Sequence, residues 1–215
     1  MTVIRLTIFL SLVLAAFMGA ALGVLSESAR AQSRPVNLER LVNDAGIIFS
    51  GTVVKIVTGE KDLGMDLYTT YYTFAVHEAL LGVETDTVTI KQYGGESGGQ
   101  SYYPPGVPRF ERGETVVAFF YPPSKIGMTS AVAKDQGKFV VRELDSSGVR
   151  FVENGTGNRN LFSKFRNPDR ITRPEWVDPG AEGPIEYEPF ISSVRNLVGV
   201  LKKGERRLGG IGKSG

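Results

Sequence analysis

Apolar and polar residues alternate along several short stretches in the middle of the chain, and little there follows a helical period. The apolar positions are mostly β-branched or aromatic, and Gly, Pro, Asp and Ser separate the stretches, which is typical of β-strands joined by turns. Gly51 interrupts the first stretch and predicts a bulge or a sharp bend. The predicted strands are residues 47–59, 67–82, 85–93, 114–122, 137–144 and 148–154.

A helical period is found only near the two ends of this body. Residues 37–45 predict a short helix, in which Asn37 caps the start and two leucines and a valine form an apolar stripe. A second helix is predicted over residues 185–203, where apolar side chains recur at helical spacing and Gly204 follows as the stop. Because no helical pattern separates the strands, we expect an antiparallel barrel or sandwich.

An uncharged apolar segment, residues 6–25, precedes this body and follows Arg5. The A-x-A sequence at residues 29–31 comes next, and this order predicts a cleaved secretory signal peptide with Gln32 as the new N-terminus. The alternative is an uncleaved membrane anchor, because about twenty apolar residues can span a bilayer. Either way, we expect the body of the protein to be exported, to the periplasm or outside the cell.

These patterns divide the 215 residues into five predicted parts. They are a signal peptide (1–31), a β-barrel domain (32–154), an irregular linker (155–184), a C-terminal helix (185–203) and a basic, glycine-rich tail (204–215). The net charge is only +2, and the body has no basic stripe of the kind that binds nucleic acid. We therefore expect no nucleic-acid partner, and a membrane contact only if the N-terminal segment stays uncleaved.

The chain has no cysteine and a single histidine, His77. Disulfides and thiolate metal sites are thereby excluded, and an ordinary zinc site lacks its ligands. Asp62 and Asp66 flank a predicted turn and would be able to meet a cation, although solvated turn residues show the same pattern. We therefore predict neither a metal site nor a cofactor.

The long connection at residues 94–113, GGESGGQSYYPPGVPRFERG, holds six glycines and three prolines. Connections of this length inside a compact domain are usually functional or disordered. We predict that its aromatic side chains are exposed and form a recognition surface for peptide or glycan. The alternative is that the connection packs against its own barrel. The predicted binding residues are Gly94, Gly95, Glu96, Ser97, Gly98, Gly99, Tyr102, Tyr103 and Phe110.

The stretch GESGG at residues 95–99 also fits G-x-S-x-G, the turn that presents a nucleophilic serine in many hydrolases. That turn needs a following helix, which the glycines and prolines after Ser97 prevent. A triad with His77 and Asp86 would fall within 21 residues, whereas trypsin-like proteases draw their three groups from distant parts of two barrels. His77 is also predicted on the less buried face of its strand. We therefore predict no catalytic residue.

The order of five segments resembles a module found in exported bacterial proteins. The segments, within residues 44–143, are DAGIIFSGTVVKI, YTFAVHEALLG, TVTIKQYGGESGG, GVPRFERGETVVAFF and QGKFVVRE. In outline they also resemble the oligonucleotide/oligosaccharide-binding (OB) barrel of the netrin-like and tissue-inhibitor-of-metalloproteinase group. The resemblance implies a mainly β fold, an antiparallel OB-like Greek-key barrel, here with a short N-terminal helix and a packed C-terminal helix. Inhibitors of that group act through an N-terminal cysteine, which this chain lacks, so their mechanism does not carry over.

The function that we expect is that of an exported, non-enzymatic binding module for a protein or a glycan. The resemblance points to a secreted protease as a partner. Two alternatives stay open, a serine hydrolase that uses Ser97 and a structural protein anchored in the cell envelope. If residues 94–113 form the binding surface, replacing them with a short linker should abolish partner capture while unfolding stays cooperative.

Overall fold

The computed structural model describes residues 34–61, 68–143, 148–165 and 182–210. Four predicted segments lie outside the described residues. They are the signal peptide, the turn with Asp62 and Asp66, most of the linker and the end of the tail. The fold that follows belongs to one compact unit that begins at Pro35.

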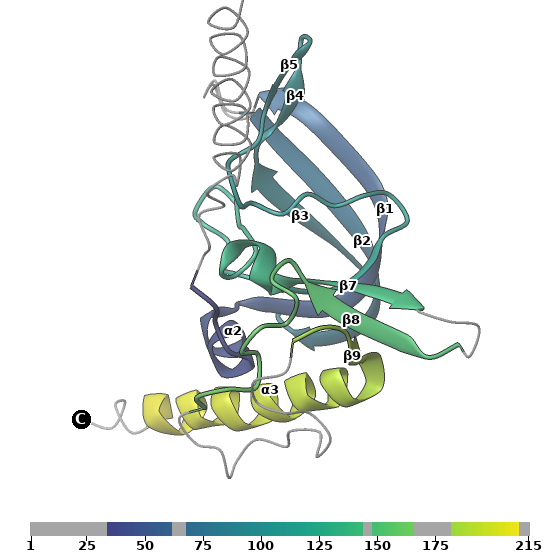
Figure 1. Cartoon of the computed structure of the whole chain (residues 1–215). Helices are drawn as coiled ribbons and strands as arrows, with labels where there is room; N and C mark the ends of the chain where they lie inside the picture. Colours follow the sequence, from purple (N-terminus) through teal and green to yellow (C-terminus); the bar gives the residue numbers. More distant parts are fainter. Residues whose placement is uncertain (1–33, 62–67, 144–147, 166–181, 211–215) are drawn as a thin grey trace, which may run out of the picture. The chain divides into compact units, whose positions relative to one another are not determined.

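One antiparallel sheet of seven strands forms the body of this unit (Figure 1). All six strands predicted from the sequence are present in it, and the bulge predicted at Gly51 appears as a register shift between Ser50 and Gly51. In spatial order the strands are β3 (Thr87–Tyr93), β2 (Tyr68–Leu81), β1 (Ile47–Lys61), β6 (Thr115–Phe120), β7 (Lys138–Glu143), β8 (Arg150–Asn154) and β9 (Ile185–Glu186).

The fold is mainly β and antiparallel as predicted, but the described strands do not close into a barrel. The edge of β3 meets the segment that follows β6, where a single parallel bridge joins Lys91 to Met128 and the Thr129 amide donates to the Lys91 carbonyl at 3.0 Å. Two prolines and a tight turn at residues 122–128 keep this segment from pairing further, because proline cannot donate to a ladder. The sheet therefore stays open at β3.

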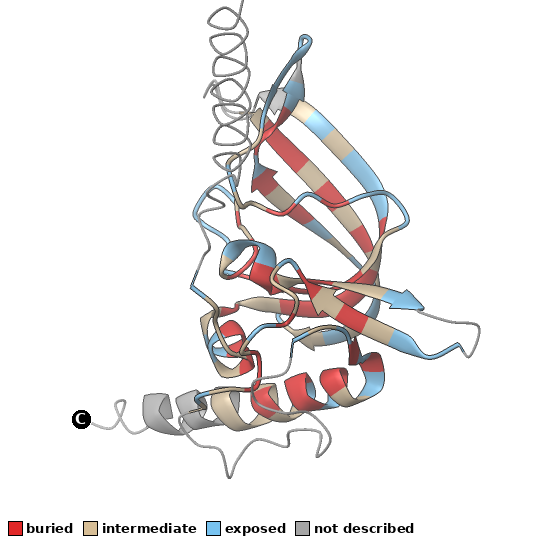
Figure 2. Ribbon diagram, in the orientation of Figure 1, coloured by how far each residue is buried: buried red, intermediate tan, exposed pale blue. Residues whose placement is uncertain are grey.

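Both faces of the sheet carry an apolar core, and β6 contributes to both. Side chains alternate along a strand, so Val116 and Phe120 face one core while Val117 and Phe119 face the other. The first core is aromatic and includes Phe49, and it lies against the long connection. Figure 2 shows the resulting bands of buried residues along the strands.

Two helices cover the second core. The first, α2 (Leu38–Asp44), begins as predicted at Asn37, whose side-chain oxygen accepts from the Arg40 amide at 2.9 Å. The second, α3 (Tyr187–Gly210), packs its apolar face on the core, and its Tyr187 hydroxyl donates to Ser50 Oγ at 2.9 Å. No helix within the described ranges is both long and apolar enough to cross a membrane.

The predicted boundaries of the second helix were wrong at both ends. Residues Ile185–Glu186 form β9 instead of the first turn, because they pair with β8 at the edge of the sheet. The helix also continues past Gly204. One glycine costs a helix about 1 kcal/mol, and the good helix formers on both sides of it offset that cost.

A candidate binding surface beside the long connection

The first half of the long connection is a hairpin, formed by β4 (Gly95–Ser97) and β5 (Gln100–Tyr102). Gly98 and Gly99 make its two-residue turn, with φ of +56° and +77°. Positive φ at both central residues defines the turn that suits a tight hairpin, and glycine adopts it without strain. The backbone thus accounts for these two glycines of GESGG, while the side chain of Ser97 lies outside the described part of the chain.

The first two glycines of the connection have a different role, because they let the hairpin lie directly on β1 and β2. A Cβ atom at Gly95 would be 2.6 Å from Thr58 Oγ1 and 2.9 Å from the Thr69 carbonyl oxygen. The Gly94 amide donates to the Tyr68 carbonyl at 2.8 Å, with a φ of +108°. The base of the hairpin is therefore buried and fixed by close backbone approach.

Three side chains join the hairpin to the returning part of the connection. The Tyr103 hydroxyl donates to Glu96 Oε1 at 3.3 Å, and the Arg109 guanidinium lies over the Tyr103 ring at 3.9 Å from its centre. Arg109 and Glu96 are 3.6 Å apart and well exposed, so their ion pair contributes little to stability. Of the predicted binding residues, Glu96 and Tyr103 thus lie together on the surface, beside Arg109.

The prediction that Phe110 is exposed was wrong, because this residue is only 4% exposed. It packs edge-on against Tyr72 and Phe74, with ring centres 5.0 and 5.3 Å apart. The prediction rested on its place in a long connection rich in glycine and proline, but the chain turns back between Glu111 and Glu114 and the ring packs inwards. Phe110 is therefore part of the core, and a ligand on the surface does not meet it.

Lys138 on β7 holds the second half of the connection, residues 104–113, in place through three contacts. Its ammonium group pairs with Glu114 at 2.8 Å, with the two side chains only 13% and 16% exposed. It also donates to the Arg109 carbonyl at 2.6 Å and lies 4.8 Å from the centre of the Phe110 ring. Burial raises the pKa of the neighbouring Tyr72 above its usual value, and the Tyr103 hydroxyl adds a smaller upward effect.

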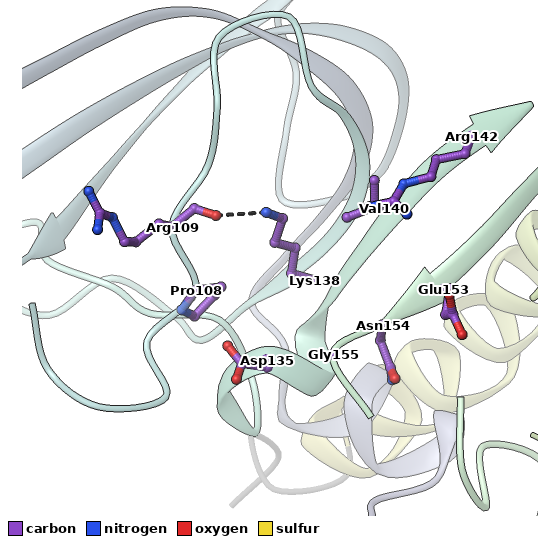
Figure 3. Close-up of a pocket in the computed structure, with 9 residues that line it drawn as sticks. All are labelled: Pro108, Arg109, Asp135, Lys138, Val140, Arg142, Glu153, Asn154 and Gly155. Carbon is purple, nitrogen blue, oxygen red and sulfur yellow. Dashed lines mark hydrogen bonds between the residues drawn. The ribbon is translucent and has the colours of Figure 1, made fainter. Parts of the chain in front are cut away.

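A pocket of about 260 Å³ lies beside Lys138, between the connection and strands β7 and β8 (Figure 3). Lys138 reaches across it to the Arg109 carbonyl, while the polar ends of Asp135, Arg142 and Glu153 are dispersed around the pocket. A ligand site needs polar groups that converge on one point. We therefore do not interpret this pocket as a ligand site. The contact between Lys138 and Arg109 across it supports the connection.

A second pocket, of about 400 Å³, lies between the connection and the segment that follows β6. We call it the tyrosine–proline cleft. It is lined by Tyr93, Pro104, Val107, Tyr121, Pro122, Ser124, Met128, Thr129 and Ser130.

Exposed apolar side chains gather at this cleft. Tyr93 and Tyr121 are each 38% exposed, Ile126 is 37% exposed within the turn between Ser124 and Met128, and Tyr102 is 45% exposed. The ring of Tyr102 contacts that of Tyr93, with centres 5.4 Å apart. These are four of the seven large apolar side chains that are exposed among the described residues. Such a cluster marks an interaction surface.

The cleft and the turn beside it include residues that the sequence prediction missed. Tyr102 was predicted, but Tyr93 and Tyr121 were assigned only to strands, and Ile126 was assigned to no element. The sequence Tyr-Pro-Pro at residues 121–123, directly after an apolar strand, was a usable signal, because an aromatic residue followed by prolines cannot continue into the sheet. What the sequence lacked was the information that β3 and this segment lie side by side.

The alternative site at Ser97 gains no support from its expected partners. His77 lies exposed on β2, as predicted, and its Nε2 is 3.2 Å from the Thr52 hydroxyl. Asp86 lies in the turn before β3, where its carbonyl accepts from the Val76 amide. Within the described residues, no three His, Asp or Glu side chains are grouped so that they could hold a metal ion.

Comparisons of the chain with models of protein families, with curated proteins and with solved structures found no match. The resemblance to the OB barrel of the netrin-like group therefore stays a prediction from the sequence. The function is inferred from the geometry of the surface and from the sequence alone.

Proposed function

We propose that the protein is an exported, non-enzymatic binding module that holds its ligand on the tyrosine–proline cleft. The observation that carries the proposal is that two exposed tyrosines, Tyr93 and Tyr121, line one cleft. Exposed Tyr102 contacts the Tyr93 ring, and exposed Ile126 lies in the turn between the lining residues Ser124 and Met128. Exposing four large apolar side chains together costs free energy in water, and a ligand that covers them recovers it. The signal-peptide pattern of residues 1–31 supports export.

The order of the strands supports the finer proposal of an OB-like Greek key. Strands β1, β2 and β3 follow one another as antiparallel neighbours, and β6 returns by the long connection to pair with β1. Three such strands and a returning fourth beside the first define a Greek key. In this proposal the open edge at β3, bridged only through Lys91 and Met128, is where the barrel is incomplete. That edge borders the cleft.

The test is capture of proteins and glycans from the medium or periplasm of the source cell by the immobilised full chain. We expect Ile126→Ser combined with Tyr121→Ala to abolish capture. The matched control is Val54→Ser, because Val54 is similarly exposed, at 42%, but lies on β1, which contributes no lining residue, whereas the turn that holds Ile126 contributes Ser124 and Met128. Capture that survives the cleft variant, while circular dichroism shows both variants folded, would contradict the proposal.

Two further measurements address export and the hydrolase alternative. Sequencing the mature N-terminus should give Gln32 first if the signal peptide is cleaved. A fluorophosphonate probe should not label the protein, because we assign Ser97 no nucleophilic role. Labelling that Ser97→Ala removes would revive the hydrolase.

A further inference from the structure

We infer that the tyrosine–proline cleft binds an extended, proline-containing peptide segment that also carries acidic residues. This inference rests on the proposed function and names the ligand class of the same site. Its first support is the chemistry of the walls. Tyrosine rings and prolines face the cleft, and grooves lined by aromatic rings are the surfaces that bind polyproline-type peptides.

The polar groups of the cleft argue for a peptide over a glycan. Its lining residues include no charged or amide side chain, and such groups are needed to pair many of a sugar's hydroxyls. The Thr129 hydroxyl is occupied, because it donates to the Tyr121 carbonyl at 2.6 Å. An apolar chain with few donors suits these walls better than a sugar.

The backbone of the cleft floor leads to the same conclusion. The Tyr121 amide donates to the Ser130 carbonyl at 3.1 Å, and the Ser124 amide donates to the Met128 carbonyl at 2.8 Å. With these groups paired, a ligand does not gain by adding a strand to the segment that follows β6, and along this wall it must be held through its side chains. Burying a peptide N–H without a partner is unfavourable, and proline has no N–H to bury.

The charges around the cleft predict acidic residues in the ligand. Lys91 donates to the Ile126 carbonyl at 3.1 Å, which places its ammonium group at the turn on one rim. Lys125 lies exposed in that same turn. Lys134 lies across Gly106 on the other side, where a Cβ would be 2.7 Å from Lys134 Cδ. The lining residues carry no charge of either sign, so the three lysines around the cleft give it a preference for an acidic ligand.

The experiment measures binding of three short fluorescent peptides to the full chain by anisotropy. The first repeats Glu-Pro-Pro, the second replaces Glu with Lys, and the third replaces Pro with Gly. We expect the first to bind at least tenfold more tightly than either of the others, and its affinity to fall as salt is added. In the variant Lys125→Glu this preference over the Lys peptide should shrink severalfold.

The cleft variants locate the binding. Tyr121→Ala should weaken binding of the Glu-Pro-Pro peptide at least tenfold, because exposed tyrosines in such surfaces are often binding hot spots. Ile126→Ser serves as the second variant, because Tyr121 also accepts a hydrogen bond from the Ala133 amide at 3.4 Å and its loss could disturb the fold. Val54→Ser should bind like the wild type.

Two results would overturn the inference. One is a Glu-Pro-Pro peptide that binds no better than its Gly or Lys counterpart, and the other is unchanged binding in both folded cleft variants. If the peptides fail while the cleft variant still loses capture from the cell fractions, the ligand class is wrong and the proposed function stands. If the cleft variant also captures as much as the wild type, both the inference and the proposed function fail.

Discussion

The two halves of the connection at residues 94–113, residues 94–103 and 104–113, have different roles. In the first half, a Cβ atom added at Gly98 or Gly99 would meet no other atom within 4 Å, and Tyr102 stands on the surface. In the second half, Phe110 lies in the aromatic core and Lys138 fastens the chain from outside. The tip of the first half displays side chains to solvent, whereas the second half places Phe110 in the core.

This difference shows that a glycine- and proline-rich connection is not uniformly replaceable. Deleting all of residues 94–113 would remove the Phe110 ring from between Tyr72, Phe74 and Phe120. We therefore expect that deletion to unfold the protein, contrary to the expectation from sequence. Substitutions of single residues separate the two roles.

Phe110→Ala should have the largest effect, a loss of about 3–5 kcal/mol in the free energy of unfolding. The reason is that the cavity would open in a core whose neighbouring strands β2 and β6 cannot collapse into it. Urea unfolding followed by circular dichroism measures it. The matched control is Tyr102→Ala in the exposed half, with an expected change below about 0.5 kcal/mol. Equal losses in the two variants would erase the distinction between the halves.

The elements of the fold were predictable where a local pattern decides the structure. Six strands and the Asn37 cap follow from alternation and capping, which depend only on neighbouring residues. Strand β9 was missed because two residues carry no period, and only its pairing with β8 makes it a strand. Barrel closure was equally beyond local signals, because it depends on whether the distant segment at Met128 pairs with β3.

The candidate site was predictable in part for the same reason. The Gly-Gly turn between residues 97 and 100 is a recognisable hairpin signal, although we predicted one long connection there and no hairpin. Phe110 was misplaced because it lies in a connection rich in glycine and proline, which is typical of an exposed loop, while its burial is set by the distant Tyr72 and Lys138. The cleft itself joins residues almost forty positions apart, Tyr93 and Ser130 at its extremes.

Gly95→Ala should have the next largest effect, because the base of the hairpin has no room for a methyl group. The new Cβ would lie 2.9 Å from the Thr69 carbonyl oxygen, so backbone atoms of β2 or β4 must move. Overpacking of this kind costs about 1–3 kcal/mol. Urea unfolding measures the loss. A cost near zero would mean that the hairpin is not docked on the sheet, which would weaken the comparison between its base and its tip.

Tyr72→Phe tests the contacts of the second half of the connection through the dependence of the free energy of unfolding on pH. At neutral pH the loss of the hydrogen bond to the Phe110 backbone should cost about 1 kcal/mol. Burial raises the pKa of folded Tyr72, so above pH about 10 the unfolded chain releases this proton while the folded protein keeps it. The free energy of unfolding of the wild type should then fall as the pH rises. The difference between this free energy and that of Tyr72→Phe should become smaller. Parallel stability profiles up to pH about 11 would contradict this account.

The smallest effect is expected at the hairpin tip, and there the type of residue matters more than its size. A Cβ at Gly98 has no atoms within 4 Å, but the φ of +56° is unfavourable for alanine. Gly98→Ala should therefore cost about 1 kcal/mol through strain alone. Gly98→Asn should cost less than Gly98→Ala, because Asn-Gly is a preferred pair for a two-residue hairpin turn. Urea unfolding of both variants gives the comparison, and if Asn costs as much as Ala, the glycine is not there for the turn.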